Sequence, residues 1–310
     1  MATAADRLHV HQRAPVGRAA PAVVPDGAAW TSPWPYLLVH GSMDRATSFA
    51  RVAARLPNAT VVTYDRRGYA GSWRRGPSEE FNDQVADLLE VVAGREVVTF
   101  GHSFGGDVVL AAAQHHPELI RAAVVWEAPM PWLATWPPST AGAAVLADGG
   151  DGAEVAERFM RRMVGDRIWE RLPASTRLAR RREGPALIAE MRALRSAPWD
   201  PGEVTIPVIV GAGAASRDHH RRSAVELAAA LPCAELVSVP GAEHGAHLSH
   251  PGEVAALIER AARLAATARG AGVPRPPVRS APGLLGVVTA GGASSIATAP
   301  PTAAAGEEPA

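Results

Sequence analysis

The feature that most constrains the fold is a glycine-flanked serine between an apolar run and a run that suits a helix. Residues 97–100 read Val-Val-Thr-Phe, residues 101–105 read Gly-His-Ser-Phe-Gly, and residues 108–116 have the composition of a helix. This order predicts a strand, a sharp turn and a helix, with the Ser103 hydroxyl held at the edge of a sheet on a strained backbone. A Cβ at either glycine would collide with a neighbouring element in so tight a turn. The alternative is a glycine-rich turn whose serine only caps the helix, and the strand and helix on either side favour a reactive serine.

Apolar runs alternate with helix-compatible runs along most of the chain. Runs of strand character lie at residues 36–40, 59–64, 97–100, 120–126, 205–210 and 234–239, and residues 8–12 are a possible edge strand. The alternation predicts an α/β fold with a mostly parallel central sheet and helices on both faces. Reactive groups are then expected at the carboxyl ends of the strands.

The alternation is interrupted once, at residues 129–200. This stretch has prolines, tryptophans and arginine-rich amphipathic segments but no convincing buried strand, and we interpret it as a helical insertion. The sequence therefore predicts an N-terminal segment at residues 1–29, one α/β domain at residues 30–268, and a C-terminal tail at residues 269–310. The tail is rich in Pro, Ala, Gly and Thr with few large apolar groups, which is typical of disorder.

Composition limits the partners and the compartment. The 310 residues carry no net charge, and no basic stripe suggests nucleic acid. Cys233 is the only cysteine, which excludes an internal disulfide and makes a cysteine-based metal site implausible. No apolar run approaches the ~20 residues of a membrane span, and the N-terminus lacks the apolar core of a signal peptide. We expect a cytoplasmic protein without a membrane or nucleic-acid partner, and the sequence does not predict its oligomeric state.

Four motifs in this order resemble the α/β-hydrolase fold superfamily. They are His40-Gly41, the Tyr-Asp-Arg-Arg-Gly-Tyr-Ala-Gly-Ser loop at residues 64–72, the serine turn at 101–106, and Pro-Gly-Ala-Glu-His at 240–244. The resemblance covers roughly residues 30–268. It implies the α/β-hydrolase fold with a helical cap inserted after the sixth strand of the family, the strand that here ends at Trp126.

The resemblance also implies a base for the serine. A serine hydroxyl is a poor nucleophile unless a neighbouring base takes its proton. In the family, the catalytic histidine lies in the loop that follows the strand at 234–239, at the position of His244. His247, three residues further along, is the local alternative. Ser103 is the implied nucleophile and His244 the implied base.

The acid that orients the histidine departs from the family pattern. Most members have an Asp just after the strand at 205–210, near Ala214, where this chain has no carboxylate. Asp218 is the first carboxylate after it and is expected in the first turn of the next helix. A subset of the family has the acid one strand earlier, as in haloalkane dehalogenases, and Glu127 occupies that place here. We predict Glu127 as the acid, with Asp218, or no acid, as the alternatives.

Acyl transfer also needs two N–H donors where negative charge develops. In this fold one donor is the residue after the nucleophile, here Phe104, and the other lies in the loop after His40-Gly41. We predict the backbone amides of Met43 and Phe104 as the oxyanion hole, with Ser42 as the alternative to Met43.

A serine nucleophile favours an acyl-enzyme. The first hypothesis is therefore an esterase-like hydrolase of a small-molecule carboxylic ester, lactone or thioester, with its substrate choice set by the cap. C–C bond hydrolysis and cofactor-free perhydrolysis use similar sites in this fold and stay open. The missing Asp near Ala214 also leaves open a non-catalytic small-molecule-binding protein. None of these hypotheses needs a metal ion or an organic cofactor.

Overall fold

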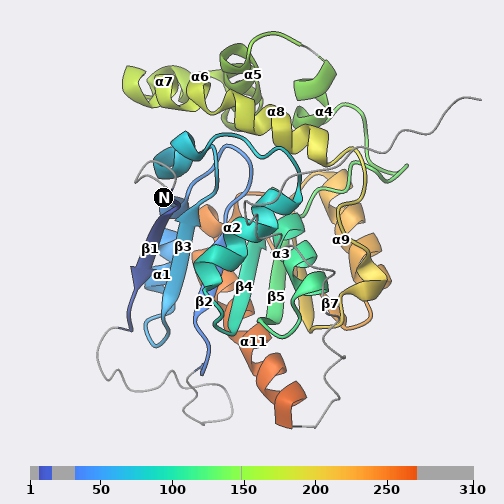
Figure 1. The fold of residues 1–310 in the computed structure, drawn as a ribbon. Helices are drawn as coiled ribbons and strands as arrows, with labels where there is room; N and C mark the ends of the chain where they lie inside the picture. The colour runs from blue at the N-terminus through green and yellow to red at the C-terminus, as the bar shows by residue number, and fades with distance from the viewer. Residues whose placement is uncertain (1–6, 16–31, 148, 271–310) are drawn as a thin grey trace, which may run out of the picture. The chain divides into compact units, whose positions relative to one another are not determined.

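The central element is a seven-stranded sheet. The computed structural model describes residues 7–15, 32–147 and 149–270. In these residues the strands are arranged β1-β3-β2-β4-β5-β6-β7 (Figure 1). Their bounds are β1 (His9–Arg13), β2 (Tyr36–Val39), β3 (Val61–Asp65), β4 (Val97–His102), β5 (Ile120–Trp126), β6 (Val208–Gly213) and β7 (Ala234–Val239). Only β1 runs antiparallel to its neighbour, β3, and the other neighbours pair in parallel. The predicted α/β fold with a mostly parallel sheet is confirmed.

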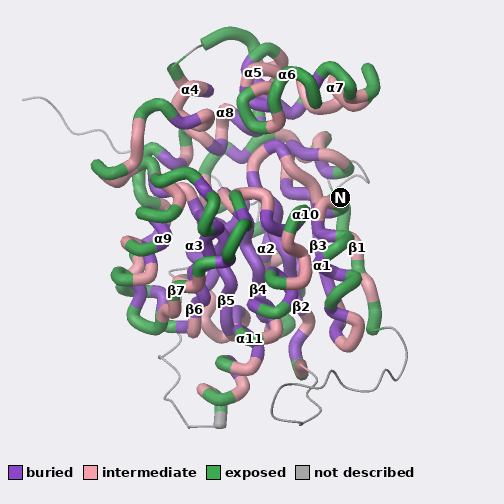
Figure 2. The backbone as a smooth tube through the Cα atoms, turned by 180° about the vertical axis from the view of Figure 1, so that it is seen from behind, coloured by how far each residue is buried: buried purple, intermediate pink, exposed green. Residues whose placement is uncertain are grey.

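Helices cover both faces of this sheet. On one face, α2 and α3 pack side by side and α9 packs on β6, while α1 and α11 cover the opposite face (Figures 1 and 2). Their bounds are α1 (Ala50–Ala54), α2 (Asn82–Val92), α3 (Phe104–His115), α9 (Asp218–Ala230), α10 (Ala246–Ser249) and α11 (Pro251–Gly270). Among the described residues, none of the helices combines the length and apolar character that a membrane crossing requires.

The central strands are apolar on both sides because each side faces a helical layer. Along β5, Ala123 and Val125 belong to the apolar cluster under α2 and α3, whereas Ala122 and Val124 belong to the cluster under α1 and α11. This alternation follows from the two-residue period of a strand. The continuous apolar runs in the sequence are thereby explained, and the polar groups are left for the strand ends.

The chain between β5 and β6 forms a helical cap. Its helices are α4 (Ala141–Ala147), α5 (Gly152–Val164), α6 (Asp166–Arg171), α7 (Ala174–Arg182) and α8 (Gly184–Ala193). The cap begins after the strand that ends at Trp126, which is the fifth of the seven strands described here. The cap lies beyond the carboxyl ends of β2 and β3 (Figure 1). Glu190 of the cap bonds there to Ser42 and Tyr69, in the loops that follow those two strands.

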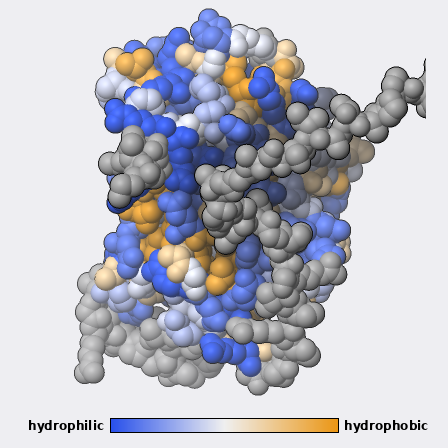
Figure 3. Space-filling model, in the orientation of Figure 1, coloured by the Kyte–Doolittle hydropathy of each residue, from blue (hydrophilic) through white to orange (hydrophobic). Residues whose placement is uncertain are grey.

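The cap has an apolar core of its own. Phe159, Met160 and Trp169 are buried there, together with Leu187 from α8. The cap also exposes apolar side chains, among them Met163, Ile168 and Leu178, and Figure 3 shows apolar patches on it between hydrophilic ones. Phe159 and Trp169 therefore help to hold the cap together.

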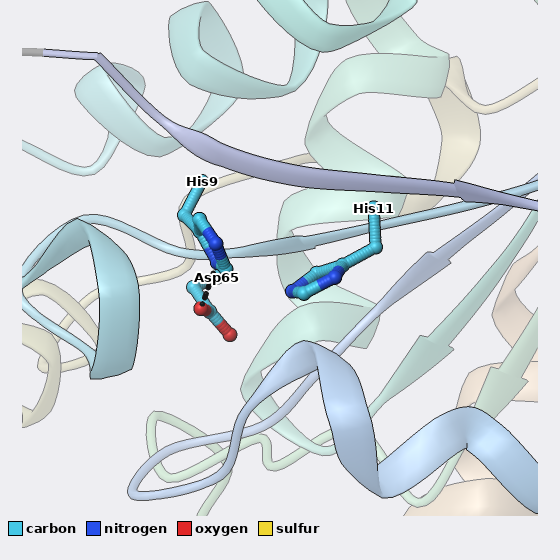
Figure 4. A group of neighbouring side chains, drawn as sticks. All are labelled: His9, His11 and Asp65. Carbon is cyan, nitrogen blue, oxygen red and sulfur yellow. Dashed lines mark hydrogen bonds and ion pairs between the residues drawn. The ribbon is translucent and has the colours of Figure 1, made fainter.

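The edge strand β1 lies within the predicted N-terminal segment and is fastened to β3. His9 and His11 project from the same face of β1 toward Asp65, and His9 Nδ1 lies 2.9 Å from Asp65 Oδ2 (Figure 4). Asp65 also accepts hydrogen bonds from the amides of Ala46 and Gly71. This carboxylate therefore ties together the edge strand and two loops. The predicted disordered tail lies outside the described residues, apart from the last turn of α11.

Candidate active site

Ser103 lies on a strained turn between β4 and α3. Its backbone has φ 53° and ψ −129°, a conformation that a residue with a Cβ rarely adopts. The Ser103 amide donates a 2.9 Å hydrogen bond to the Trp126 carbonyl, which holds the turn against β5. A Cβ on Gly101 would lie 2.5 Å from the Gly105 carbonyl oxygen, and one on Gly105 would overlap the Val39 carbonyl. The two glycines are needed because the turn has no room for a side chain at either place.

Glu127 comes directly after β5 and is hydrogen-bonded to His244. Its side chain is fully buried, and its Oε2 lies 2.8 Å from His244 Nδ1. The other oxygen, Oε1, accepts hydrogen bonds from the Gly213 amide, at 2.8 Å, and from the Ser216 hydroxyl. A buried carboxylate is costly unless it is paired and hydrogen-bonded, and Glu127 meets both conditions. The geometry therefore suits a carboxylate that orients an imidazole.

The loop after β6, where most members of the resembled family carry the acid, supports Glu127 instead. Gly213 and Ser216 lie at the two ends of this loop, and both donate to the Glu127 carboxylate. Asp218 does not reach the site: its side chain is 68% exposed and pairs with Arg221 within the first turn of α9. The geometry favours Glu127 over Asp218. Neither Gly213 nor Ser216 was singled out from the sequence. The only sign of their role was a loop of small residues at the place where most family members have an Asp.

Two further histidines hold His244 in place. His102 Nε2 donates a 3.0 Å hydrogen bond to the His244 carbonyl oxygen, and the His220 ring stacks on the His244 ring at 4.4 Å. Burial, aided by the nearby His244, lowers the pKa of His220 to about 2, so His220 is a neutral stacking partner at neutral pH. His247, the alternative base, lies 3.3 Å from Asp44. Its position leaves His244 as the partner of Glu127.

The loop proposed to stabilise negative charge is held by the cap. Met43 has φ 56°, and its side chain lies in the apolar core of the cap. Its carbonyl oxygen accepts a 2.6 Å hydrogen bond from Arg180 of α7, and the Ser42 hydroxyl donates to Glu190 of α8. Phe104, the other predicted donor, is the first residue of α3. Because both cap residues bond to the loop itself, the cap and the oxyanion loop form one connected unit.

A fully buried ion pair anchors the cap to the domain. Glu190 of α8 pairs with Arg66, which follows β3, and both side chains are inaccessible to solvent. The Tyr69 hydroxyl also donates to Glu190, at 2.8 Å. The Arg66 guanidinium lies 4.7 Å from the centre of the Phe104 ring, next to the serine. The Tyr-Asp-Arg-Arg-Gly motif thus links the cap to the site, a role that its sequence alone did not reveal.

Three clusters of His and carboxylate side chains in the described part of the chain have donor atoms close enough to share a metal ion. One of them, Glu127 with His220 and His244, is the site described above. The second joins His9 and His11 to Asp65 (Figure 4). The third consists of Asp44, His102 and His247, and lies directly beside His244.

Comparison with known proteins identifies the family to which this chain belongs. The model of a family described as the alpha/beta hydrolase family matches residues 36–257, a span that holds all five predicted site residues. A curated relative, the uncharacterized hydrolase YraK of Bacillus subtilis (strain 168), is 35% identical over 97 residues, which are 29% of this chain and 36% of the relative. The match thus spans about a third of that relative's length.

Solved structures share the fold at low sequence identity. A thermophilic esterase from Thermogutta terrifontis has a TM-score of 0.59 and 19% identity, covering 83% of this chain and 93% of its own. The enol-lactonase from Burkholderia xenovorans LB400 has a TM-score of 0.57 and 20% identity, covering 82% of this chain and 96% of its own. At these identities the likeness establishes the fold, and the chemistry must be argued from the site.

Proposed function

Because the chain belongs to the alpha/beta hydrolase family, we propose that it is a serine hydrolase that forms an acyl-enzyme with an ester-type small-molecule substrate. The observation that carries the proposal is the 2.8 Å hydrogen bond between His244 and the buried Glu127. This pair is held beside the strained turn of Ser103 by the bond from His102 to His244. A strained serine, an oriented imidazole and a buried carboxylate are the three groups that acyl transfer through serine requires.

In the proposed mechanism, Glu127 accepts the Nδ1–H of His244 and leaves Nε2 free to act as the base. Nε2 takes the Ser103 proton as the serine oxygen attacks the substrate carbonyl. The backbone amides of Met43 and Phe104 would bind the resulting oxyanion, and one such donor is typically worth about 10²–10³-fold in kcat. His244 then returns the proton to the leaving alcohol, which departs and leaves the acyl group on Ser103.

Water completes the cycle by the same steps. His244 takes a proton from a water molecule, the resulting hydroxide attacks the acyl carbonyl, and the tetrahedral intermediate collapses. The acid leaves and Ser103 recovers its proton from His244. Throughout, the Glu127 side chain keeps the imidazole oriented and stabilises the imidazolium, which is the role of the acid in such a triad.

The class of substrate is argued from the nucleophile and the cap. A serine nucleophile favours acyl transfer, because attack on a carbonyl carbon gives an acyl-enzyme that water can hydrolyse. Arg180 and Glu190 of the cap bond to the loop that holds Ser42 and Met43, which puts the cap next to the proposed oxyanion hole. We therefore propose a carboxylic ester, lactone or thioester as the substrate.

The test is hydrolysis of p-nitrophenyl esters of increasing acyl length by the wild type, Glu127→Gln and Asp218→Asn. We expect hydrolysis by the wild type, a kcat lower by about 10⁴-fold in Glu127→Gln, and little change in Asp218→Asn. Far-ultraviolet circular dichroism checks that each variant is folded. Loss in Asp218→Asn but not in Glu127→Gln would move the acid to Asp218. A folded wild type that cleaves no ester, thioester or lactone would contradict the proposed function.

A further inference from the structure

Three polar side chains from distant parts of the chain meet beside His244, where the His102 ring centre lies 4.7 Å from the His244 ring centre. Asp44 belongs to the loop after β2, His102 ends β4, and His247 lies in α10. His102 and His247 are 6% and 3% exposed, and the Asp44 side chain is 20% exposed. Asp44 Oδ2 lies 3.3 Å from His247 Nε2 and 4.0 Å from His102 Nδ1, and all three donor atoms lie within 4.8 Å of one another.

The hydrogen bonds around His102 determine which nitrogen carries its proton. Nε2 donates to the His244 carbonyl oxygen, so Nδ1 of the neutral ring bears a lone pair. Nδ1 is itself buried and has no hydrogen-bond partner. A lone pair on nitrogen therefore faces a carboxylate oxygen, and neither atom can donate to the other.

His247 also has two buried ring nitrogens, and neither makes a hydrogen bond of ordinary geometry. Its Nε2 lies 3.3 Å from Asp44 Oδ2, and its Nδ1 has no partner. A buried polar atom without a partner costs roughly 1–3 kcal/mol, so such atoms are rare in folded proteins. Here His102 and His247 both leave buried nitrogens unsatisfied around one point, beside a carboxylate. A cation bound at that point would contact Nδ1 of His102, Nε2 of His247 and the Asp44 carboxylate together.

We propose that Asp44, His102 and His247 form a binding site for a divalent transition-metal ion of the zinc class. Zinc binds nitrogen and carboxylate oxygen at about 2.0–2.2 Å in tetrahedral geometry, which separates neighbouring donor atoms by roughly 3.4 Å. Asp44 and His247, 3.3 Å apart, already have this separation. His102 Nδ1 lies 4.0 Å from Asp44 Oδ2 and within 4.8 Å of the His247 nitrogen, so binding requires the His102 ring to rotate toward both ligands.

The groups behind these three residues match those that support metal ligands. A ligating histidine nearly always donates its other N–H to a carbonyl or carboxylate, as His102 does to His244. A ligating carboxylate is in turn hydrogen-bonded, and the Ser48 hydroxyl lies within hydrogen-bond distance of Asp44 Oδ2, at 3.0 Å, and of the Arg45 carbonyl oxygen, at 2.8 Å. Two imidazoles and one carboxylate suit Zn²⁺, Co²⁺ or Ni²⁺ better than Mg²⁺ or Ca²⁺, which prefer oxygen ligands. The partly exposed Asp44 provides the side from which an ion enters.

The other two clusters fit a metal ion less well. In the edge-strand cluster (Figure 4), both oxygens of Asp65 already accept hydrogen bonds from backbone amides, and His9 is 52% exposed. In the site itself, Glu127 accepts from Gly213 and Ser216 and pairs with His244. The functional hypotheses from the sequence needed no metal ion, and the proposed site departs from them. The sequence gives no local sign of this site, because its three ligands lie in segments far apart along the chain.

The experiment is a titration of the chelator-treated full-length protein with Zn²⁺ by calorimetry, repeated with Co²⁺ and followed by visible absorption. We expect the wild type to bind one equivalent at this site, and Co²⁺ to give the visible absorption of a low-coordinate nitrogen–oxygen site. Loss of a residue that only hydrogen-bonds to a metal ligand typically weakens metal binding by about 10–100-fold. Asp44→Asn and His247→Gln each remove a ligand and should weaken Zn²⁺ binding by more than that. Asp44→Asn keeps the size of the side chain, which protects the fold.

His11→Gln and His220→Gln locate the ion, because each removes one ligand of a rival cluster. Unchanged affinity in both variants, with loss in Asp44→Asn and His247→Gln, supports the proposal. No binding by the folded wild type would mean that Asp44 and His247 form only a buried ion pair, and would overturn it. Loss of binding in His11→Gln or His220→Gln, but not in Asp44→Asn, would overturn it as well. The readout is metal binding, so its failure is distinct from a failure of ester hydrolysis.

Discussion

Replacement of Glu190 by glutamine tests whether the cap is held by a single buried charge. Glu190 pairs with Arg66 where both side chains are inaccessible to solvent, and it accepts hydrogen bonds from Tyr69 and Ser42. Glutamine has nearly the same shape, and the two hydroxyls can turn to accept from its NH₂ group. The substitution therefore removes little besides the negative charge that balances the Arg66 guanidinium.

The expected cost follows from leaving that guanidinium buried without a counter-charge. Removing one partner of a buried ion pair typically destabilises a protein by about 3–5 kcal/mol. Arg66 keeps hydrogen bonds to the His40 carbonyl and to Gln84, and it also lies over the rings of Tyr69 and Phe104. We therefore expect the lower end, about 3 kcal/mol. For a domain of this size, this corresponds to a Tm lower by about 6–12 °C.

Urea and thermal unfolding of Glu190→Gln measure this cost, with Glu170→Gln as the matched control in the same cap. Glu170 pairs with Arg161 and Arg177, but its side chain is 57% exposed. Exposed pairs of this kind contribute about 0–1 kcal/mol. The reasoning is refuted if Glu190→Gln unfolds within about 1 kcal/mol of the wild type, or if the two variants lose equal stability.

Two further substitutions test the core and the serine turn. Burial raises the pKa of Asp107 well above its usual range despite a hydrogen bond from Trp199, so the folded state binds a proton that the unfolded state releases as the pH rises. The free energy of unfolding should therefore fall as the pH rises from the ordinary carboxyl pKa to the raised one. Urea unfolding at a series of pH values measures this dependence, and Asp107→Asn should reduce it. An unchanged dependence on pH in Asp107→Asn would contradict the reasoning. A Cβ on Gly41 would lie 2.8 Å from the Ser103 Cβ, so Gly41→Ala should lower kcat by about 10²-fold or more. Gly245→Ala is the control, because the Cβ added there meets nothing within 4 Å, and its kcat should stay unchanged. Equal activity in the two glycine variants would show that the turn tolerates the displacement.

Local patterns in the sequence were enough to predict the sheet and the serine turn. The apolar runs lie where strands form, because a strand between two helical layers is buried on both sides. The strand expected at residues 205–210 forms at Val208–Gly213, because apolar composition marks a buried strand without marking its ends. Helix α7 could not be predicted from an apolar stripe, because none of its residues is buried.

The long-range partners could not be predicted from local patterns. Two strands, β4 and β5, and several helices lie between Arg66 and Glu190 in the sequence, and nothing near either residue indicates the other. The same holds for Ser216, which donates to Glu127 from the loop where an acid was expected and not found. Such contacts depend on the packing of distant segments, so the residues that support the candidate site became visible only in the folded chain.

The central claim is that Ser103 is a nucleophile activated by His244 and Glu127. Labelling with a fluorophosphonate probe tests it most directly, because the probe reacts with activated serines and mass spectrometry locates the adduct. We predict an adduct on Ser103 in the wild type, no adduct in Ser103→Ala, and much slower labelling in His244→Ala and Glu127→Gln. A folded wild type that takes up no probe, or an adduct on another residue, would contradict the account and favour a binding protein built on a hydrolase fold.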